Sequence, residues 1–481
     1  MWLTTILVIS VVYVYGLFFF FKNIFRIYSL YIFLLNFVLW LLYTIIFFNK
    51  SILWYQCIIQ FYNISFFNYS YSIGIDILSI SLILLSSFLL ALCLISYWNL
   101  RYKIYMYIYI LIILSILLIN IFLVTDFIFF FIFFESIIIP VFLLIGIWGS
   151  RVRKISASYQ FFIYTLIGSI FILICILDIF LNKGSSSIEF FLFSCFFDNR
   201  SFIIFLLLFI GFSIKVPIFP FHIWLPEAHV EASSTGSVIL AGILLKLGIY
   251  AMYRFLVVPF YTIYIDLIYF ILVISVIGLT YSALVALNQI DIKKIIAYSS
   301  ISHMNFSLIG LFSCNLEGLI GSYIMMLAHG LTSSSLFLSI GILYERYKTR
   351  IIFYYGGLVN IMPLFSIYFF IFILSNFSFP GTFNFIGEIL ILLGGIKVSN
   401  MIILFSLLGL LLSLVYSLFL YNKIFYGLIQ VFFFKYYSDC TRLENNILFI
   451  FFFLIILFGI YPYSIIDVSY LFTNKLYIVS F

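Results

Sequence analysis

Hydrophobic residues form long, continuous runs along this chain instead of alternating with polar residues. Runs of about 20 apolar residues recur throughout, which is the length that a membrane-spanning helix needs. Continuous runs disfavour a transmembrane barrel, because barrel strands alternate apolar and polar positions. The pattern therefore predicts an all-α integral membrane protein with about fourteen transmembrane helices.

The predicted spans are joined by short connections that leave no room for a soluble domain. They cover roughly residues 1–21, 27–48, 75–98, 104–124, 126–147, 156–182, 202–221, 233–256, 260–287, 294–313, 318–344, 361–395, 400–425 and 447–470. Prolines break two of them, at Pro217 and Pro220 and again at Pro380. Segment 51–73 is rich in Asn, Ser and Tyr and is predicted to be a loop at the membrane interface.

Composition supports a membrane environment. Of the 481 residues 66% are hydrophobic and 8% are charged, and the mean hydropathy is +1.30. An ordinary soluble domain has roughly 25% charged residues. The 64 Phe and 38 Tyr favour an AT-rich organelle genome, with an AT-rich nuclear or bacterial genome as the alternative. The six cysteines show no metal-ligand spacing, so we predict neither disulfides nor a metal site.

Basic residues predict the orientation. Fifteen of the 23 lysines and arginines fall in the odd-numbered loops, and six fall in the even-numbered loops and the C-terminal tail. Because positive charge marks the cytoplasmic or matrix side, both termini are expected on the outer side. The formal net charge of +7 then requires no nucleic acid.

A weak internal repeat is visible. Segment 142–147 (FLLIGI) is echoed by 306–311 (FSLIGL), and each copy is followed by a span with a central polar group and then by a proline-broken span. Five spans separate the copies, so the two halves have opposite orientations, as in transporters with inverted repeats. Chance similarity between Leu- and Ile-rich segments is the alternative.

Three charged residues lie inside apolar spans, where a charge costs about 2.5–3.5 kcal/mol on insertion scales. Glu135 lies in FIFFESIIIP, Lys215 lies in GFSIKVPIFPFH beside Pro217, and Lys246 is central in LAGILLKLGIY. A carboxyl group balanced between burial and a basic neighbour can take up and release protons. The alternatives are a structural ion pair for Glu135, a lysine reaching the interface for Lys215 and a structural role for Lys246.

Glu388 follows the break at Pro380 and mirrors Lys215 in the repeat; its alternative is an interfacial carboxylate. Histidine titrates nearest neutral pH and passes protons through either ring nitrogen. The four histidines lie near these segments, and His303 and His329 stand beside serines and threonines that could hold water. His222 and His229 are weaker candidates, and any single histidine can be a packing residue.

Long segments around these residues resemble the antiporter-like membrane subunits of respiratory complex I. The segments are KVP at 215–217, HIWLPEAHVEA at 222–232, Gly236-Ser237, LLK at 244–246, DIKKIIAYSSISHM at 291–304 and NFIGE at 384–388. The resemblance covers about Gly74 to Tyr426. Glutamate at Glu388, where the chain 2 and chain 5 branches usually carry lysine, makes the chain similar to the chain 4 branch.

The resemblance implies a fold of fourteen helices with two inverted five-helix repeats and two broken helices. It divides the chain into N-terminal helices at 1–103, repeats at 104–256 and 260–426, and a C-terminal part at 427–481. It also implies multi-pass insertion in the mitochondrial inner membrane beside other antiporter-like subunits and lipids.

The function implied is proton translocation driven by electron transfer from NADH to ubiquinone elsewhere in the complex. NAD, FMN, iron–sulfur clusters and ubiquinone would be bound by partner subunits, and this chain would hold no cofactor. Glu135 and Lys215 would form a switching pair, Lys246 the central relay, His303 and His329 polar relays, and Glu388 the group facing the exit or the next subunit. The alternatives are an Mrp-type Na⁺/H⁺ antiporter subunit, a purely structural membrane arm and a solute transporter.

Overall fold

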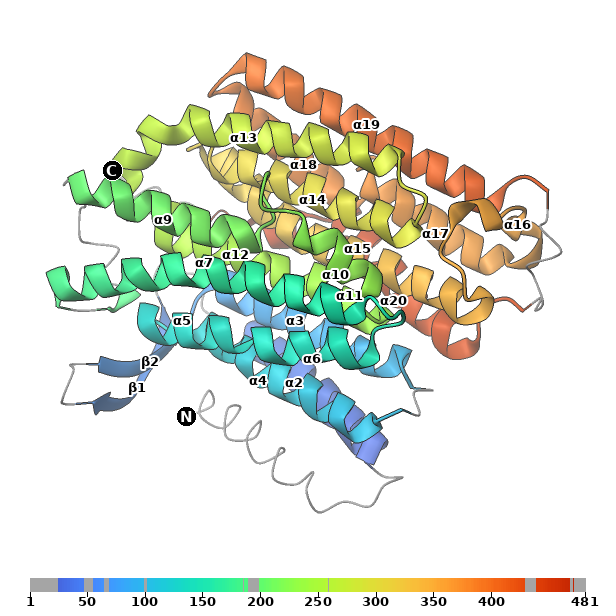
Figure 1. The fold of residues 1–481 in the computed structure, drawn as a ribbon, viewed down its shortest axis with the longest axis horizontal. Helices are drawn as coiled ribbons and strands as arrows, with labels where there is room; N and C mark the ends of the chain where they lie inside the picture. Colours follow the sequence, from blue (N-terminus) through green and yellow to red (C-terminus); the bar gives the residue numbers. More distant parts are fainter. Residues whose placement is uncertain are drawn as a thin grey trace.

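The fold is known from a computed structural model that describes residues 25–46, 55–64, 69–98, 102–184, 186–188, 199–257, 259–428, 438–467 and 470. Long helices lie side by side, and their ends gather at two opposite faces of the molecule (Figure 1). Ten of the described helices are long and apolar enough to cross a membrane. The predicted first span, 1–21, lies outside the described residues.

The elements follow the predicted spans closely. The first half contains α2 (Phe25–Ile46), α3 (Ile77–Ser96), α4 (Ile104–Leu123), α5 (Phe127–Ser136), α6 (Ile138–Trp148), α7 (Lys154–Lys183), α9 (Asn199–Lys215), α10 (Trp224–Glu231), α11 (Ser234–Ile239), η2 (Leu240–Leu244), α12 (Leu245–Met252) and η3 (Tyr253–Val257). The second half contains α13 (Tyr261–Leu287), α14 (Ile292–Leu311), α15 (Leu316–Tyr347), η4 (Ile352–Tyr354), α16 (Leu358–Ile361), α17 (Pro363–Asn376), α18 (Phe383–Ile396), α19 (Asn400–Phe425) and α20 (Arg442–Ile460).

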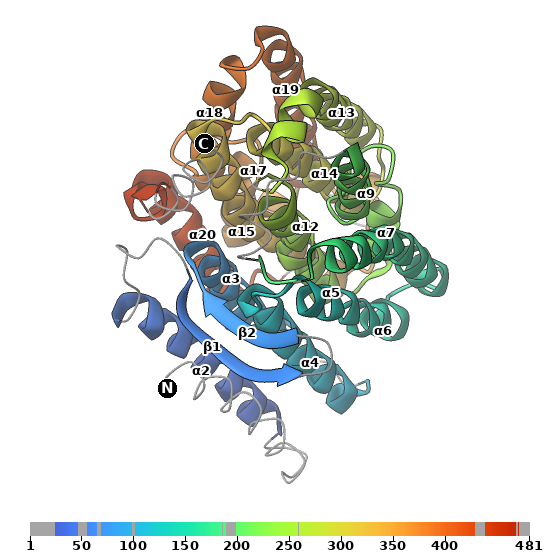
Figure 2. The same ribbon diagram turned by 90° about the vertical axis from the view of Figure 1, so that its left-hand side faces the viewer.

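The expected interfacial loop at 51–73 is wrong for its described part. Residues Gln56–Ile64 (β1) and Tyr69–Ile75 (β2) pair as an antiparallel hairpin. It lies across one end of the helix bundle (Figure 2), and β2 is joined to the α4–α5 connection by a bridge between Ile73 and Val124. Pairing satisfies backbone groups that a loop would have to expose, so a hairpin is the better solution beside the membrane.

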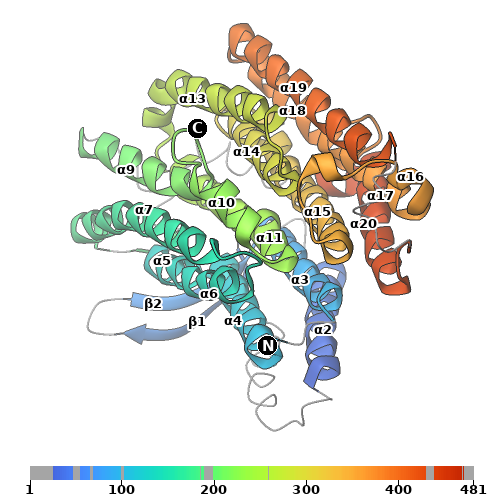
Figure 3. The same ribbon diagram turned by 45° about the vertical axis from the view of Figure 1, so that its right-hand side comes forward.

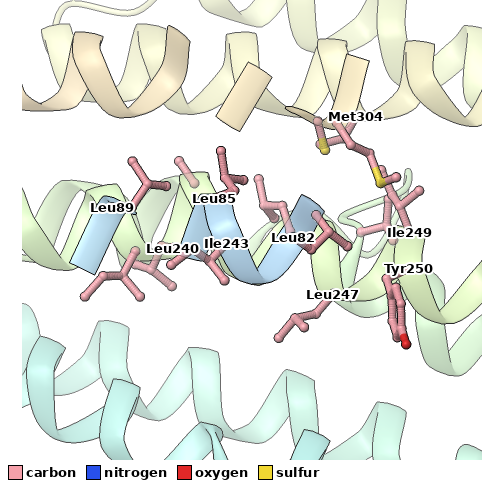
Figure 4. Packing of buried hydrophobic residues seen from close by; sticks show 14 of the residues in the cluster. Leu82, Leu85, Leu89, Leu240, Ile243, Leu247, Ile249, Tyr250 and Met304 are labelled. Atoms are coloured by element: carbon pink, nitrogen blue, oxygen red, sulfur yellow. The ribbon is translucent and has the colours of Figure 1, made fainter. Parts of the chain in front are cut away.

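α3 fills the centre of the molecule. Its apolar side chains Leu82, Leu85 and Leu89 pack against Leu240 and Ile243 of η2 (Figure 4). α3 is therefore enclosed by protein, whereas α2, α7 and α19 keep exposed apolar faces. The enclosed helices α3, α12, α14 and α15 form the interior in which the candidate site lies. Figure 3 shows α3, α14 and α15 from another side.

Candidate functional site

The first helix break places Lys215 at the end of α9. Pro217 has no amide hydrogen, so the helix cannot continue past it in regular form. The carbonyl oxygen of Ile214 accepts a hydrogen bond of 2.9 Å from the indole N–H of Trp224. The break thus leaves Lys215 inside the protein without leaving that carbonyl unpaired in the membrane.

Lys215 contacts Glu135, as predicted from the sequence. Lys215 Nζ lies 3.4 Å from Glu135 Oε1 and donates a hydrogen bond of 3.0 Å to the Phe134 carbonyl oxygen. The ammonium also lies 3.1 Å from the centroid of the Phe134 ring, a cation–π contact. Both side chains are largely buried, so the pair is shielded from water and its attraction is strong.

α12 packs directly on this helix break. A Cβ atom at Gly248 would lie 2.5 Å from Val216 Cγ2 and 3.2 Å from the Val216 backbone nitrogen, so only glycine allows the approach. A cavity of about 20 Å³ beside Lys215 is also lined by Leu244 and Leu247, which flank Lys246 in the sequence. That volume has room for about one water molecule.

Lys246 is fully buried at the start of α12. Its Nζ donates a hydrogen bond of 2.5 Å to the carbonyl oxygen of Ala241 and lies 2.8 Å from Nδ1 of His329. Ala241 belongs to the π-helical turn η2, an irregularity that often marks functional sites. When Lys246 is an ammonium it can only donate, so a neutral His329 then accepts at Nδ1 and carries its proton on Nε2.

Two histidines continue the line towards Glu388. The ring centroids of His329 and His303 lie 5.6 Å apart, and His303 Nδ1 lies 3.7 Å from Glu388 Oε1. All three side chains are buried. Glu388 stands on α18, which begins after the break between α17 and α18 at Pro380 and Gly381. The structure therefore brings together Lys246, His329, His303 and Glu388. Glu135 and Lys215 form a separate pair beside the cavity that Leu244 and Leu247 also line.

Serine hydroxyls surround the histidines on α14 and α15. Each donates its hydrogen to a carbonyl oxygen of its own helix, three or four residues earlier. The serines are Ser299, Ser300, Ser302 and Ser307 on α14, and Ser333, Ser334, Ser335 and Ser339 on α15. The lining thus presents hydroxyl oxygens as acceptors.

Comparison with known proteins assigns the family. Residues 124–415 match the family model described as NADH:quinone oxidoreductase/Mrp antiporter, TM. NADH-ubiquinone oxidoreductase chain 4 of Chondrus crispus is 42% identical over 436 residues, which cover 90% of this chain and 88% of that protein. The chain 4 protein of Acanthamoeba castellanii is 45% identical over 408 residues, which cover 83% and 81%. The chain belongs to the NADH-ubiquinone oxidoreductase chain 4 family.

Solved structures share this chain 4 fold. A chain of respiratory complex I from Thermus thermophilus with bound NADH has a TM-score of 0.87 at 26% identity and covers 98% of this chain and 99% of its own. A chain of the Mrp complex from Dietzia sp. DQ12-45-1b has a TM-score of 0.82 at 17% identity, over 93% and 92% of the two chains, and is similar in fold alone. The family membership confirms the branch that Glu388 indicates.

Some charged residues of this chain 4 family member lie where sequence reasoning did not place them. Arg254 is one of the six basic residues that the orientation argument counted in the even-numbered loops and the C-terminal tail. It is instead buried in η3 and forms an ion pair with Asp76. Both oxygens of the Asp76 carboxylate are satisfied within the protein, because Oδ1 accepts a hydrogen bond from the Ser79 backbone N–H and Oδ2 pairs with Arg254. Asp76 and Arg254 are 178 residues apart in the chain, so no local pattern could reveal the pair.

Lys293 and Arg350, also assigned to loops, are buried as well. Lys293 Nζ donates a hydrogen bond of 2.8 Å to the carbonyl oxygen of Ala232, and Arg350 bonds the Val230 carbonyl oxygen and the Ser150 hydroxyl. Lys293 belongs to the DIKK motif at 291–294, so the sequence did contain a signal for an ordered, charged region at this end of α14. His229 stacks on Phe337 with ring centroids 4.8 Å apart, and neither of its ring nitrogens has a hydrogen-bond partner in the described structure.

Proposed function

We propose that this chain translocates protons across the mitochondrial inner membrane as a membrane-arm subunit of NADH:ubiquinone oxidoreductase. One observation carries the proposal: a buried series of titratable side chains runs from the Glu135–Lys215 pair through Lys246 to Glu388 inside the helix bundle. Charged residues persist at membrane depth mainly where they pair or move charge.

The proposed transfer begins at the first break. An ionised Glu135 stabilises the Lys215 ammonium, and separation of the pair lets Lys215 release its proton towards Lys246. The small cavity that Lys215 shares with Leu244 and Leu247 is the nearest described space for a water molecule on this route. Lys246 passes a proton to Nδ1 of His329, 2.8 Å away, and His329 loses its Nε2 proton towards His303. Glu388 then accepts the proton or repels the next charge.

The energy for this transfer must come from elsewhere in the complex. Moving one charge against the membrane potential costs about 2.3 kcal/mol per 100 mV. The part of the chain that the structure describes has no group of three or more His, Cys, Asp or Glu side chains that could hold a metal ion. As the family resemblance implies, we assign NAD, FMN, iron–sulfur clusters and ubiquinone to partner subunits, with neighbouring antiporter-like subunits and lipids as contacts in the membrane.

The finer architecture belongs to the same proposal. We infer fourteen spans with two inverted five-helix repeats at 104–256 and 260–426, flanked by 1–103 and 427–481, and both termini on the intermembrane-space side. Two breaks support the repeat: α9 stops at Lys215 before Pro217, and α17 stops before Pro380, with Glu388 following. Ion pairs join Arg151 to Asp291 and Lys294 to Glu227, so basic residues from two odd-numbered loops lie close together in the fold. The inside-positive rule assigns their end of the bundle to the matrix side.

The test is proton pumping by the reconstituted complex that carries Lys246→Ala, with NADH oxidation followed in parallel. We expect both rates to fall together while the complex assembles, because Lys246 is the group of the proposed series that contacts His329. The matched control is Lys397→Ala, which removes an exposed lysine paired with Glu317 and should change neither rate. Wild-type pumping in Lys246→Ala would overturn the relay.

Sodium dependence tests the Mrp alternative. Pumping by the wild-type complex that is unchanged when Na⁺ is replaced by K⁺ supports proton transport alone. A requirement for Na⁺ would favour the antiporter function of the structural relative in the Mrp complex.

A further inference from the structure

Two cations are buried at the end of the bundle where α10 meets α14. Lys293 is 1% exposed and Arg350 is 2% exposed. Among the described residues, neither forms an ion pair within 4.0 Å. Their hydrogen bonds go to neutral acceptors, which are the carbonyl oxygens of Ala232 and Val230 and the hydroxyl of Ser150. Because buried charges are usually paired, this arrangement indicates a role beyond packing.

The charges around Lys293 leave this end of the interior positive. Arg151 pairs with Asp291 at 3.6 Å, so these two charges largely cancel. Glu231 then supplies one negative charge for the two buried cations, Lys293 and Arg350. The C-terminal end of α10 adds about half a negative charge, which is less than the excess. A metal cation that approaches this end is therefore repelled.

This positive site adjoins the proposed proton series. His229 lies on α10, three residues before the Ala232 carbonyl group that Lys293 contacts. The His229 ring is fully buried, and neither of its nitrogens has a hydrogen-bond partner in the described part of the chain. The charges of Lys293 and Lys246 both act on this ring. His229 is thus within electrostatic reach of the cation at the end of the bundle and of the proposed central relay.

A lysine at this position can distinguish protons from metal ions. The Lys293 ammonium repels both kinds of cation, but it can exchange only a proton. A buried lysine changes its protonation state readily, and the neutral amine has a lone pair. It can therefore take a proton from water at the end of the bundle and release a proton to the His229 ring. A metal ion cannot be passed on through an amine in this way.

We propose that Lys293 is a proton-selective gate at the matrix end of the series. This proposal rests on the proposed function and specifies which ion the series accepts. Lys293 Nζ releases a proton to the lone pair of a His229 ring nitrogen, and the other ring nitrogen releases its proton towards a neutral Lys246. The Lys293 amine then regains a proton from matrix water. The charges of Lys293 and Arg350 keep Na⁺ and K⁺ out of the interior.

A variant that keeps the charge tests the proton transfer. Lys293→Arg retains the positive charge but removes the exchangeable lone pair, because arginine does not deprotonate in proteins. Proton pumping by the reconstituted complex should fall about a hundredfold, the lower end of what a positioned proton-transfer group contributes. The matched control is Lys294→Arg, since Lys294 is partly exposed, pairs with Glu227 at 2.9 Å and should tolerate the change. Wild-type pumping in Lys293→Arg would overturn the transfer step.

A variant that removes the charge tests the exclusion of metal ions. In Lys293→Met, Glu231 loses a neighbouring positive charge, and its Oε2 is buried without a partner among the described residues. Na⁺ can then bind beside it and stabilise the folded complex. The midpoint temperature of thermal unfolding should be higher in Na⁺ than in choline for Lys293→Met, and equal in both for wild type, Lys293→Arg and the matched Lys294→Met.

The thermal measurement requires no pumping activity, and Lys293→Gln replaces Lys293→Met if the methionine variant does not assemble. Equal midpoints in Na⁺ and choline for the assembled variant would overturn the exclusion. Failure of the proposed function is distinguishable: wild-type pumping in Lys246→Ala would show that the series itself is wrong. Loss of pumping in Lys246→Ala, together with wild-type behaviour of the Lys293 variants, would retain the series and reject the gate.

Discussion

Only one oxygen of the Glu135 carboxylate has a hydrogen-bond partner among the described residues. Oε1 contacts Lys215 at 3.4 Å, and Oε2 is buried without a partner. A buried carboxylate oxygen without a partner is unfavourable, so Lys215 supplies the main polar contact of this side chain. This incomplete pairing supports the switching role that we propose for the pair.

We predict that Glu135→Gln uncouples this switch. The amide keeps the shape of the side chain but removes the charge that stabilises the Lys215 ammonium. Hydrogen bonds to charged groups contribute about 1.5–3 kcal/mol, so the pumping rate should fall about tenfold or more. Asp266→Asn makes the same chemical change on an exposed acid and should have no effect. Equal pumping rates in the two variants would remove Glu135 from the series.

Asp126 lies in the connection between α4 and α5, outside the described membrane helices, and gives a pH-dependent prediction. Burial raises the pKa of Asp126 to about 6, although Ser72 donates a hydrogen bond of 3.4 Å to it. Because the folded pKa exceeds the unfolded value of about 3.9, the stability difference between wild type and Asp126→Asn is greatest below pH 4. It should decrease by about 2 kcal/mol as pH rises through 6. Thermal unfolding of both purified complexes from pH 4 to 7.5 measures this difference, and a difference independent of pH would contradict the prediction.

At the scale of elements, the broken helices are where sequence and structure agree best. Prolines at 217 and 380 predicted interruptions, and α9 and α17 end before them. The hairpin was missed although its signal is present. Tyr69, Tyr71, Ile73 and Ile75 alternate with Ser70, Ser72 and Gly74, which is a period of two. Because long apolar runs surround this segment, its polar composition led to the prediction of a loop.

The Trp224 hydrogen bond should be important for the first break. Trp224→Phe leaves the Ile214 carbonyl without that donor in the membrane, and an unsatisfied buried acceptor costs about 1–3 kcal/mol. Trp148→Phe is the matched control, since its indole donates to the carbonyl oxygen of Tyr102, an exposed residue that water can reach. Thermal stability of the assembled complex should fall more for Trp224→Phe. An equal fall in both variants would show that the break does not depend on this bond.

At the scale of the whole molecule, buried ion pairs hold distant segments together. Asp76 caps the first turn of α3 through a capping box with Ser79, and its second oxygen pairs with Arg254 of η3. Arg254 also lies 5.2 Å from the centroid of the Tyr55 ring at the base of the hairpin. This group connects the N-terminal helices to the helix that carries Lys246. Sequence patterns identified the spans and the charged series, but which charges pair across the fold depends on three-dimensional packing.

A double-mutant comparison tests this connection. Removing one member of a buried ion pair leaves the other charge unpaired and costs about 3–5 kcal/mol, so Arg254→Gln or Asp76→Asn alone should strongly reduce the assembled complex. The combination leaves no unpaired charge and should recover part of the loss. Blue native gels of the variants measure assembly. A double variant as damaged as the sum of the singles would mean that the two residues act separately.

The serine lining of α14 and α15 has an electrical consequence. Because every one of those hydroxyl hydrogens is held by its own helix, the lining offers lone pairs and no free donors. Water in contact with such a surface turns its hydrogens towards the serine oxygens. Its own lone pairs then solvate an excess positive charge well. These serines offer no free donor to a hydroxide ion, which must be solvated by donors. The two serine-rich helices therefore favour an excess proton over a hydroxide ion, and this is the sign of charge that the proposed transfer moves.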